Sequence, residues 1–190
     1  MESVLFCSKY YPGAVPFGSA TRMERVLRWF RKQEIPVHYL HLVHQSSHQA
    51  PPPSLAELVN SQHELPLAGE QALRTHPAQW RSLTRHKRNL LRRLVAQPWA
   101  RWTTRTTIKR LLRQTQATIL WIDHTYVAPL ADLLPTDGNL LRIVDTHDVL
   151  HLRDESFRAG GLPIKRPISP DDERQLLERF DLVVAIQPDD

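Results

Sequence analysis

The sequence has little of several features that would define a class of protein. Its 190 residues contain one cysteine, Cys7, which lies within the apolar run VLFCS. A single cysteine excludes an internal disulfide framework and is typical of a reducing compartment. No apolar run reaches the ~20 residues that a membrane-spanning helix needs, and the N-terminus lacks the pattern of a signal peptide. We therefore expect a cytoplasmic protein that is soluble or peripheral at the inner face of the membrane.

Acidic residues are missing from one long stretch of the chain. From Gln71 to Ile122 there is no aspartate or glutamate, while 12 of the 25 arginines and lysines lie there. The rest of the chain holds 13 basic and 20 acidic residues, so the net charge of +5 comes from this block. Within it, apolar positions at helical spacing predict a basic helical segment at 81–116.

The basic segment leaves three functional alternatives open. Tryptophans on a basic amphipathic helix are typical of membrane-surface segments, with Arg85, Arg88, Arg92 and Arg93 as the candidates for contact with an anionic membrane surface. The same charge suits nucleic-acid phosphates, but no helix-turn-helix, zinc or RNP-type motif accompanies it, so no specific nucleic-acid partner is expected. A solvated helical face packed on the core is the third alternative.

A complete phosphate-binding motif is also missing. Gly13 and Gly18 in YYPGAVPFGSATR have the spacing of a P-loop, but Ser19 and Ala20 stand where lysine and Ser/Thr are required. Without the lysine, NTP hydrolysis is not expected, and a G-x-G-x-x-G fingerprint is absent as well. What is present is a glycine loop before a helix. Its backbone N–H groups could bind an anion, or the glycines could serve only to form a turn.

Alternating apolar and amphipathic stretches predict the fold class. Strands are predicted at 3–8, 35–43, 117–124, 140–148 and 181–187, and helices at 19–34, within 81–116, at 128–134 and at 168–180. The polar, proline-rich stretch 45–80 is predicted to be a linker or insertion. The pattern predicts one α/β domain over residues 1–190, with a Rossmann-like parallel sheet and helices on both faces.

Polar residues gather where the predicted strands end, which is where parallel sheets bind ligands. The strand ends are 10–18, 124–126, 145–148 and Gln187. His124, next to Asp123, is a candidate general base or partner of a sugar hydroxyl, or else an ordinary surface histidine. The cleft candidates around these ends are Tyr11, Gly13, Gly18, Ser19, Arg22, Tyr126, Asp145, His147 and Asp148.

The run DTHDVLHLRDESF raises the question of a metal site. Strand alternation puts Asp145 and His147 on one face and Asp148 on the other, so we expect these residues to bind a polar substrate and expect no metal. A metal hydrolase that uses His147 and Asp148 is an alternative, and it would carry stoichiometric metal after purification.

Several of these stretches resemble the N-terminal domain of GT-B glycosyltransferases, in particular the family 4 group. The opening VLFCSKYYPGAVPFGSATRMERVLRWFRKQEIPVHYLHL is similar to the family's strand, glycine loop, helix and second strand. ILWIDHTYVAPLADLL is similar to its strand that ends in histidine, RIVDTHDVLHLRDESF to the next strand, and ERFDLVVAIQPDD to the strand that closes the domain. The resemblance covers the chain apart from about 45–115, although FGSATR stands where the family often has a double glycine.

The resemblance implies a role for several residues. His124 matches the histidine near the reaction centre, and Arg22 matches the early arginine of the first helix. Gly18 and its neighbours would lie near the donor phosphates and the acceptor, while His147 and Asp148 would line the acceptor side. The family's second domain, which binds the nucleotide sugar through paired glutamates and a basic residue, is absent from these 190 residues.

The resemblance therefore implies the N-terminal, acceptor-side part of a glycosyltransferase. The longer enzyme would transfer a sugar from a UDP- or GDP-sugar to a polysaccharide, a lipid-linked or another carbohydrate acceptor. No tightly bound cofactor is expected, and these 190 residues alone would turn over little or no substrate. The alternative function is a non-catalytic module that docks on an anionic membrane or nucleic acid through the basic helices.

Overall fold

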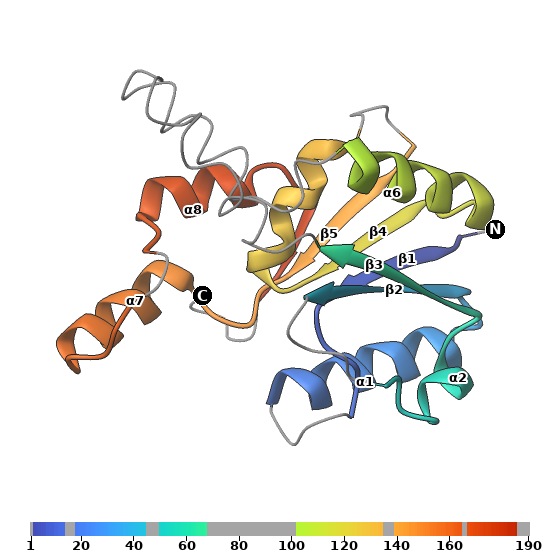
Figure 1. Cartoon of the computed structure of the whole chain (residues 1–190), viewed down its shortest axis with the longest axis horizontal. Helices are drawn as coiled ribbons and strands as arrows, with labels where there is room; N and C mark the ends of the chain where they lie inside the picture. The colour runs from blue at the N-terminus through green and yellow to red at the C-terminus, as the bar shows by residue number, and fades with distance from the viewer. Residues whose placement is uncertain are drawn as a thin grey trace, which may run out of the picture.

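The computed structural model describes residues 2–13, 18–44, 50–67, 102–134, 139–164 and 167–185. Within these residues the core of the molecule is a six-stranded sheet whose paired strands are all parallel (Figure 1). The strands are β1 (Val4–Ser8), β2 (Val37–His44), β3 (Ser61–Leu67), β4 (Ile119–Asp123), β5 (Leu141–Asp145) and β6 (Leu182–Val184). Their order, β3-β2-β1-β4-β5-β6, is that of a Rossmann-like fold. The predicted fold class is confirmed.

Helices cover both faces of the sheet (Figure 1). They are α1 (Gly18–Lys32), α2 (Leu55–Leu58), α6 (Trp102–Thr115), the 3-10 helix η2 (Thr125–Leu133), α7 (Leu150–Ala159) and α8 (Pro170–Leu177). Alternate residues of β1 point to opposite faces, so Leu5 packs in one apolar cluster with Ile108 of α6. Phe6 packs in the other cluster with Leu27 of α1. The sheet is therefore the middle of three layers.

Helix α1 connects the first two strands because one of its faces is apolar. Ala20, Met23, Leu27 and Phe30 recur at intervals of three or four residues and are all buried. The helix ends at Lys32, and Glu34 adopts a positive φ of 56° that turns the chain toward β2. The buried face fixes the rotation of the helix, which is how its early residue Arg22 comes to face the sheet edge.

Two parts of the fold differ from the sequence prediction. The predicted linker 45–80 contains α2 and strand β3, which pairs with β2 at the edge of the sheet. Strand β3 was missed for two reasons. Among its described residues, Leu65 is the one buried apolar residue. In addition, Pro66 argues against a central strand, although proline is tolerated in an edge strand. Helix α7 was also missed, since only Leu150 and Asp154 of its residues are buried.

Candidate functional site

The first part of the candidate site lies where the strand order reverses, between β1 and β4. Ser8, the last residue of β1, donates a hydrogen bond of 2.7 Å from Oγ to Oδ2 of Asp123, the last residue of β4. Nε2 of His147, just beyond β5, lies 2.9 Å from the other oxygen, Oδ1, of Asp123. The Asp123 side chain is 1% exposed. Three strand ends thus meet on one buried carboxylate, at the place where Rossmann-like sheets bind ligands.

A second buried carboxylate lies beside the first. Asp145, the last residue of β5, forms an ion pair with Arg22 of α1, with 2.7 Å between Oδ1 and a terminal guanidinium nitrogen and 3.1 Å between Oδ2 and Nε. Burial raises the pKa of Asp145, and Arg22 opposes that rise. Arg22 also donates to the carbonyl oxygen of Ala185 at 3.4 Å, so one side chain connects α1 with the ends of β5 and β6.

His124 follows β4 in an unusual backbone conformation. Its φ is +84°, and its N–H donates to the carbonyl of Asp145 at 2.9 Å. Nδ1 of its ring accepts from the backbone N–H of Tyr126 at 3.4 Å, which places the proton of the neutral ring on Nε2. Backbone strain of this kind is concentrated at functional sites. The sheet edge therefore holds a histidine whose Nε2–H is available as a donor.

The two histidines of the site have pKa values shifted in opposite directions. Burial, followed by the positive charges of His147, Lys9 and Arg153, lowers the pKa of His124 to about 3. Burial lowers the pKa of His147 too, but the hydrogen bond and charge of Asp123 outweigh it, and the pKa of His147 lies above its ordinary value. The ring centroids are 5.1 Å apart. A neutral imidazole and a readily protonated one thus lie side by side, which is an arrangement suited to donating and accepting protons.

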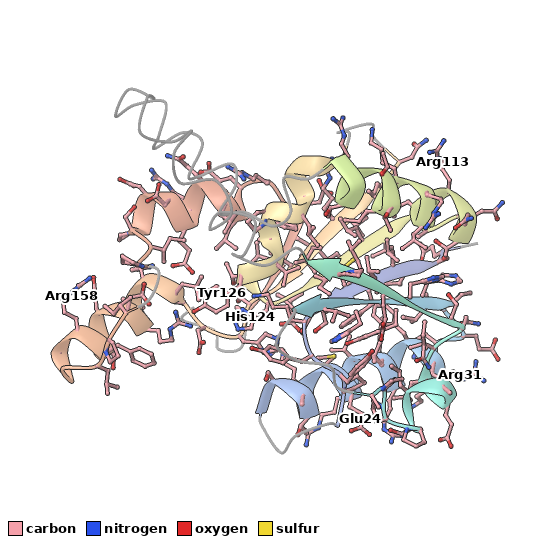
Figure 2. All side chains as sticks on the ribbon, in the orientation of Figure 1. Glu24, Arg31, Arg113, His124, Tyr126 and Arg158 are labelled. Carbon is pink, nitrogen blue, oxygen red and sulfur yellow. The ribbon has the colours of Figure 1, made fainter. Side chains whose placement is uncertain are left out.

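Cationic and aromatic side chains surround His124. Its ring stacks on Tyr126 with 4.6 Å between centroids, and Figure 2 shows the two residues together near the strand ends. The Lys9 ammonium lies 5.4 Å from the centroid of the Tyr126 ring, and the Arg153 guanidinium carbon lies 5.1 Å from it. Side chains that follow β1 and β4 and one from α7 therefore form one cluster.

The loop after β5 is held by a buried glutamate of α8. Glu173, which is 3% exposed, accepts hydrogen bonds from the backbone N–H groups of Leu150 and His151 at 2.7 and 2.9 Å. Its carboxylate also lies 2.7 Å from Nδ1 of His151. These bonds satisfy the first N–H groups of α7 where no side-chain cap is present. Glu173 thereby fixes the start of α7, close to His147.

Asp123, Asp145 and His147 are the donors that a metal ion would use. Their ligand atoms lie within 4.8 Å of one another, and carboxylate and imidazole together suit a divalent transition metal. However, His147 already faces Asp123, and Arg22 already neutralises Asp145. A metal ion would have to displace both contacts, so the resting arrangement is an ion-pair network.

The residues predicted for the site do not all lie together. Tyr126 and His147 lie beside His124, and Arg22 pairs with Asp145. Asp148 lies at the rim, 44% exposed and 3.5 Å from Arg153. Gly18 and Ser19 begin α1, and Gly13 lies in the preceding loop with a φ of +68°. Arg85, Arg88, Arg92 and Arg93 lie outside the described residues.

Tyr11, which was predicted to line the cleft, is buried and bonded to the edge strand. Its side chain is 2% exposed and packs over His41, with 3.9 Å between the ring centroids. Its hydroxyl donates to Glu64 of β3 at 2.9 Å. Tyr11 therefore ties the first loop to the edge strand β3.

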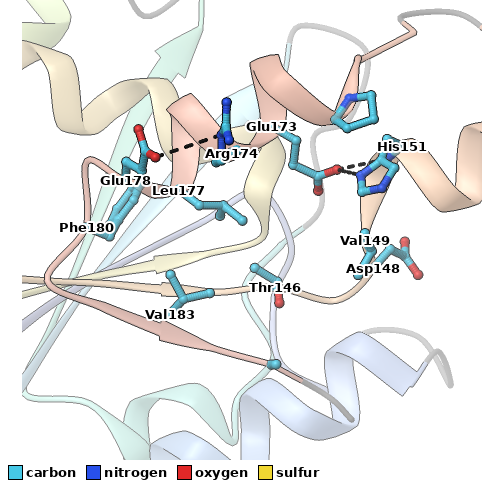
Figure 3. Close-up of a pocket in the computed structure, with 12 residues that line it drawn as sticks. Thr146, Asp148, Val149, His151, Glu173, Arg174, Leu177, Glu178, Phe180 and Val183 are labelled. Carbon is cyan, nitrogen blue, oxygen red and sulfur yellow. Dashed lines mark hydrogen bonds and ion pairs between the residues drawn. The ribbon is translucent and has the colours of Figure 1, made fainter. Parts of the chain in front are cut away.

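A cleft of about 510 Å³ lies next to the end of β5. Figure 3 shows it between α8 and β6, with Leu177, Phe180 and Val183 on its walls. Thr146 and Asp148 line this cleft, whereas the polar atoms of Asp145 and His147 lie within 4.8 Å of those of Asp123. Ala185 lines the cleft and also accepts from Arg22, so the cleft adjoins the candidate site.

Several site residues were not among the predicted ones. Asp123 was recognised only as a neighbour of His124, although its position at a strand end is the signal that would have included it. Ser8 and Lys9 carry the same signal, since Ser8 ends β1 and Lys9 follows it. Arg153 and Glu173 give no such signal, because long-range packing alone brings α7 and α8 to the sheet edge.

Fold and site together define an α/β protein with a Rossmann-like sheet and a histidine–carboxylate network at the carboxyl edge of that sheet. No protein-family model matches the chain, and no curated protein sequence matches it. Within the described residues, no helix is long and apolar enough to cross a membrane.

Proposed function

We propose that this chain is the acceptor-side, N-terminal part of a GT-B glycosyltransferase of the family 4 type. The longer enzyme transfers a sugar from a UDP- or GDP-sugar to a carbohydrate or lipid-linked acceptor. These residues position the acceptor hydroxyl, and a second domain holds the nucleotide sugar. The observation that carries the proposal is a neutral, strained His124 beside a charge-stabilised His147 at the sheet's carboxyl edge.

The properties of His124 suit a sugar-transfer centre. Its Nδ1 is occupied by the N–H of Tyr126, so the Nε2–H donates to an oxygen of the substrate. With a pKa of about 3, the ring keeps this single-donor form throughout the neutral pH range. A donor that is fixed before the substrate arrives stabilises developing charge without reorganisation. His124 is thus the residue that contacts the reacting sugar or hydroxyl.

His147 has the complementary role in this proposal. Asp123 holds its Nε2 at 2.9 Å and favours its protonated form. Ser8 donates to the other oxygen of Asp123, so both oxygens of the carboxylate are engaged. This chain of contacts fixes the imidazole of His147 5.1 Å from that of His124, where it supplies positive charge or exchanges a proton near the transferred group.

The first glycine loop fits the proposal without a P-loop lysine. Gly13 has a φ of +68°, a conformation that side chains with a Cβ rarely adopt. The loop leads into α1, whose Arg22 reaches the site. Backbone groups of a glycine loop can approach a substrate closely, while the apolar cleft next to Arg22 offers space for the less polar part of an acceptor.

The test is sugar transfer by the protein encoded by the complete natural reading frame. Release of UDP or GDP from a panel of nucleotide sugars is measured with mixed carbohydrate and lipid-linked acceptors. His124→Ala should lower kcat by about 100-fold or more, the loss typical when an electrostatic donor is removed from a transfer site. The matched control is His38→Ala, because His38 lies at the opposite end of the sheet. The kcat of this variant should stay within about twofold of that of the unmodified protein.

Two results contradict the proposal. One is the absence of acceptor-dependent nucleotide release with every donor of the panel. The other is a His124→Ala enzyme that is folded, by circular dichroism, and as active as the unmodified protein.

A further inference from the structure

The cleft between α8 and β6 has the size and the walls of a small-molecule site. Its volume of about 510 Å³ lies within the range of roughly 300–1,000 Å³ that is usual for ligand pockets. Figure 3 shows Leu177, Phe180 and Val183 around it. Val183 is 40% exposed, so a ligand that covers it removes apolar surface from water. The walls therefore favour an apolar group.

One polar pair, His151 and Glu173, also lines this cleft. Nδ1 of His151 lies 2.7 Å from the Glu173 carboxylate, which additionally accepts the backbone N–H groups of Leu150 and His151. Because the carboxylate accepts, the neutral ring carries its proton on Nδ1, and Nε2 is an acceptor. The side chain of His151 is 23% exposed, and its Nε2 bonds to no other described residue. The apolar cleft thus has one oriented hydrogen-bond acceptor on its wall.

The other charged side chains that line the cleft are already paired. Arg174 lies 3.0 Å from Asp171 and 4.0 Å from Glu178. Asp148 lies 3.5 Å from Arg153. Each charged side chain among the described residues of the lining therefore has a partner within the chain. An ion that entered the cleft would lose hydration without gaining a free counter-charge, so the cleft favours a neutral ligand.

We propose that this cleft binds a neutral ligand that has an aromatic or alkyl body and a hydroxyl group. The body lies against the apolar walls, and the hydroxyl donates a hydrogen bond to Nε2 of His151. Glu173 is a positioning residue, because it fixes the tautomer and the orientation of the His151 ring. A ligand hydroxyl without this acceptor would lose its hydrogen bonds to water on entering the cleft.

The position of the cleft connects this ligand with the proposed transfer. Ala185 lines the cleft, and its carbonyl oxygen accepts a hydrogen bond from Arg22 of the candidate site. The ligand is then the acceptor, an alcohol or glycoside with an apolar group and no phosphate. This identification as the acceptor rests on the proposed function, whereas binding in the cleft does not.

Binding to the 190-residue chain is measured with three compounds of the same shape. They are 2-naphthol, 2-methoxynaphthalene, which has no hydroxyl donor, and the anion 2-naphthoate. Calorimetry is carried out at about pH 8, where an ordinary histidine is neutral. 2-Naphthol should bind at least about threefold more tightly than 2-methoxynaphthalene, because only 2-naphthol donates to Nε2. 2-Naphthoate should bind at least about tenfold more weakly than 2-naphthol, because it finds no free cation.

Two variants of β6 locate the bound compound. Val183→Asp places a charge on the wall of the cleft and should weaken the binding of 2-naphthol at least about tenfold. Leu182→Asp is the matched control, because Leu182 is the preceding residue of the strand, is 49% exposed and points to the opposite face. It should leave the affinity within about twofold. Circular dichroism checks that both variants are folded.

Two further variants test the histidine and its partner. His151→Phe should make the affinities for 2-naphthol and 2-methoxynaphthalene equal, because the acceptor is lost and the ring is kept. In Glu173→Gln the side-chain amide donates to Nδ1, so the ring proton moves to Nε2, which then donates. The preference for 2-naphthol should disappear in this variant too. A purely structural role of Glu173 would instead weaken both compounds by the same factor.

Three results contradict binding of a neutral alcohol in this cleft. They are equal affinities for 2-naphthol and 2-methoxynaphthalene, tighter binding of 2-naphthoate than of 2-naphthol, and equal effects of Val183→Asp and Leu182→Asp in folded chains. The proposed function is judged separately, by sugar transfer in the longer protein. Binding as described without any sugar transfer leaves the cleft assignment standing and contradicts the glycosyltransferase proposal. Sugar transfer without such binding has the reverse meaning.

Discussion

At the scale of single residues, the charges of the site depend on which carboxylate each basic group faces. His147 faces Asp123, and the pKa of His147 rises in spite of burial. Burial and the surrounding cations lower the pKa of His124 to about 3. Two histidines 5.1 Å apart are thereby given opposite protonation behaviour. The sequence shows two histidines at strand ends, but it does not show which one meets an aspartate.

The first prediction concerns these two histidines. In a pH titration followed by NMR, His147 should titrate above 6.5 and His124 should remain neutral down to about pH 3. Asp123→Asn should lower the pKa of His147, because it removes the negative charge and keeps the shape. The exposed control Asp171→Asn should leave the titration of His147 unchanged.

The same shifts set the pH dependence of stability. The pKa of His124 is lower in the folded than in the unfolded state. The contribution of His124 to the free energy of unfolding is therefore present above pH ~6.5 and is lost as the pH falls toward ~3. His147 has the opposite sign, because its stabilisation is present below pH ~6.5 and is lost as the pH rises through its raised pKa. A chain in which both histidines titrate together near 6.5 would contradict this description.

At the scale of elements, the glycine loop and α1 connect the first strand to the site. Gly13 and Gly18 have the spacing of a P-loop, but they have different conformations. Gly13 has a φ of +68°, and a Cβ there would lie 3.3 Å from the Glu24 carboxylate. Gly18 begins α1 with no atom within 4 Å of a Cβ. The spacing of the two glycines therefore reflects one strained turn and one helix start.

The second prediction follows from that difference. Gly13→Ala should lower the free energy of unfolding by about 1–2 kcal/mol, the cost of a left-handed conformation for a residue with a Cβ. Gly18→Ala should leave it unchanged or raise it by up to about 1 kcal/mol, because alanine is the better helix former. Urea denaturation of the two variants measures both values. An equal change in the free energy of unfolding for both variants would contradict the different conformations assigned to Gly13 and Gly18.

The third prediction concerns the link between α1 and β5. Arg22→Met leaves Asp145 buried without its partner, and it should lower the free energy of unfolding by about 2–3 kcal/mol. In Arg22→Met/Asp145→Asn the loss should be smaller, since no unpaired charge remains. The control is Arg28→Met, which breaks the exposed Arg28–Glu24 pair of the same helix and should cost about 0.5 kcal/mol or less. An Arg22→Met chain as stable as Arg28→Met would show that the ion pair does not hold the helix to the sheet.

At the scale of the whole molecule, much of the fold could be predicted from the sequence. The central strands β1 and β4 are buried along their whole length, so they read as continuous apolar runs. The edge strand β3 could not be found this way, because an edge strand buries few side chains and tolerates Pro66. Helix α7 owes its first turn to Glu173, a contact across 23 residues at Leu150 that no local pattern reveals.

The candidate site, like the fold, could be predicted only in part from the sequence. Parallel strands end at one edge, so the convergence of His124, Asp145 and His147 follows from the strand pattern alone. The pairing of His147 with Asp123, and the approach of Arg153 to Tyr126, depend on the register of neighbouring strands and on helix packing. These contacts decide the charges of the site, and only three-dimensional structure supplies them.

The central claim is that these residues form one half of a two-domain glycosyltransferase. The measurement that tests it most directly is the sequence of the natural reading frame after the codon for Asp190. The account predicts that the frame continues into a second βα-repeating domain with paired glutamates for a nucleotide sugar. A stop codon directly after Asp190, with no such domain encoded, would contradict it.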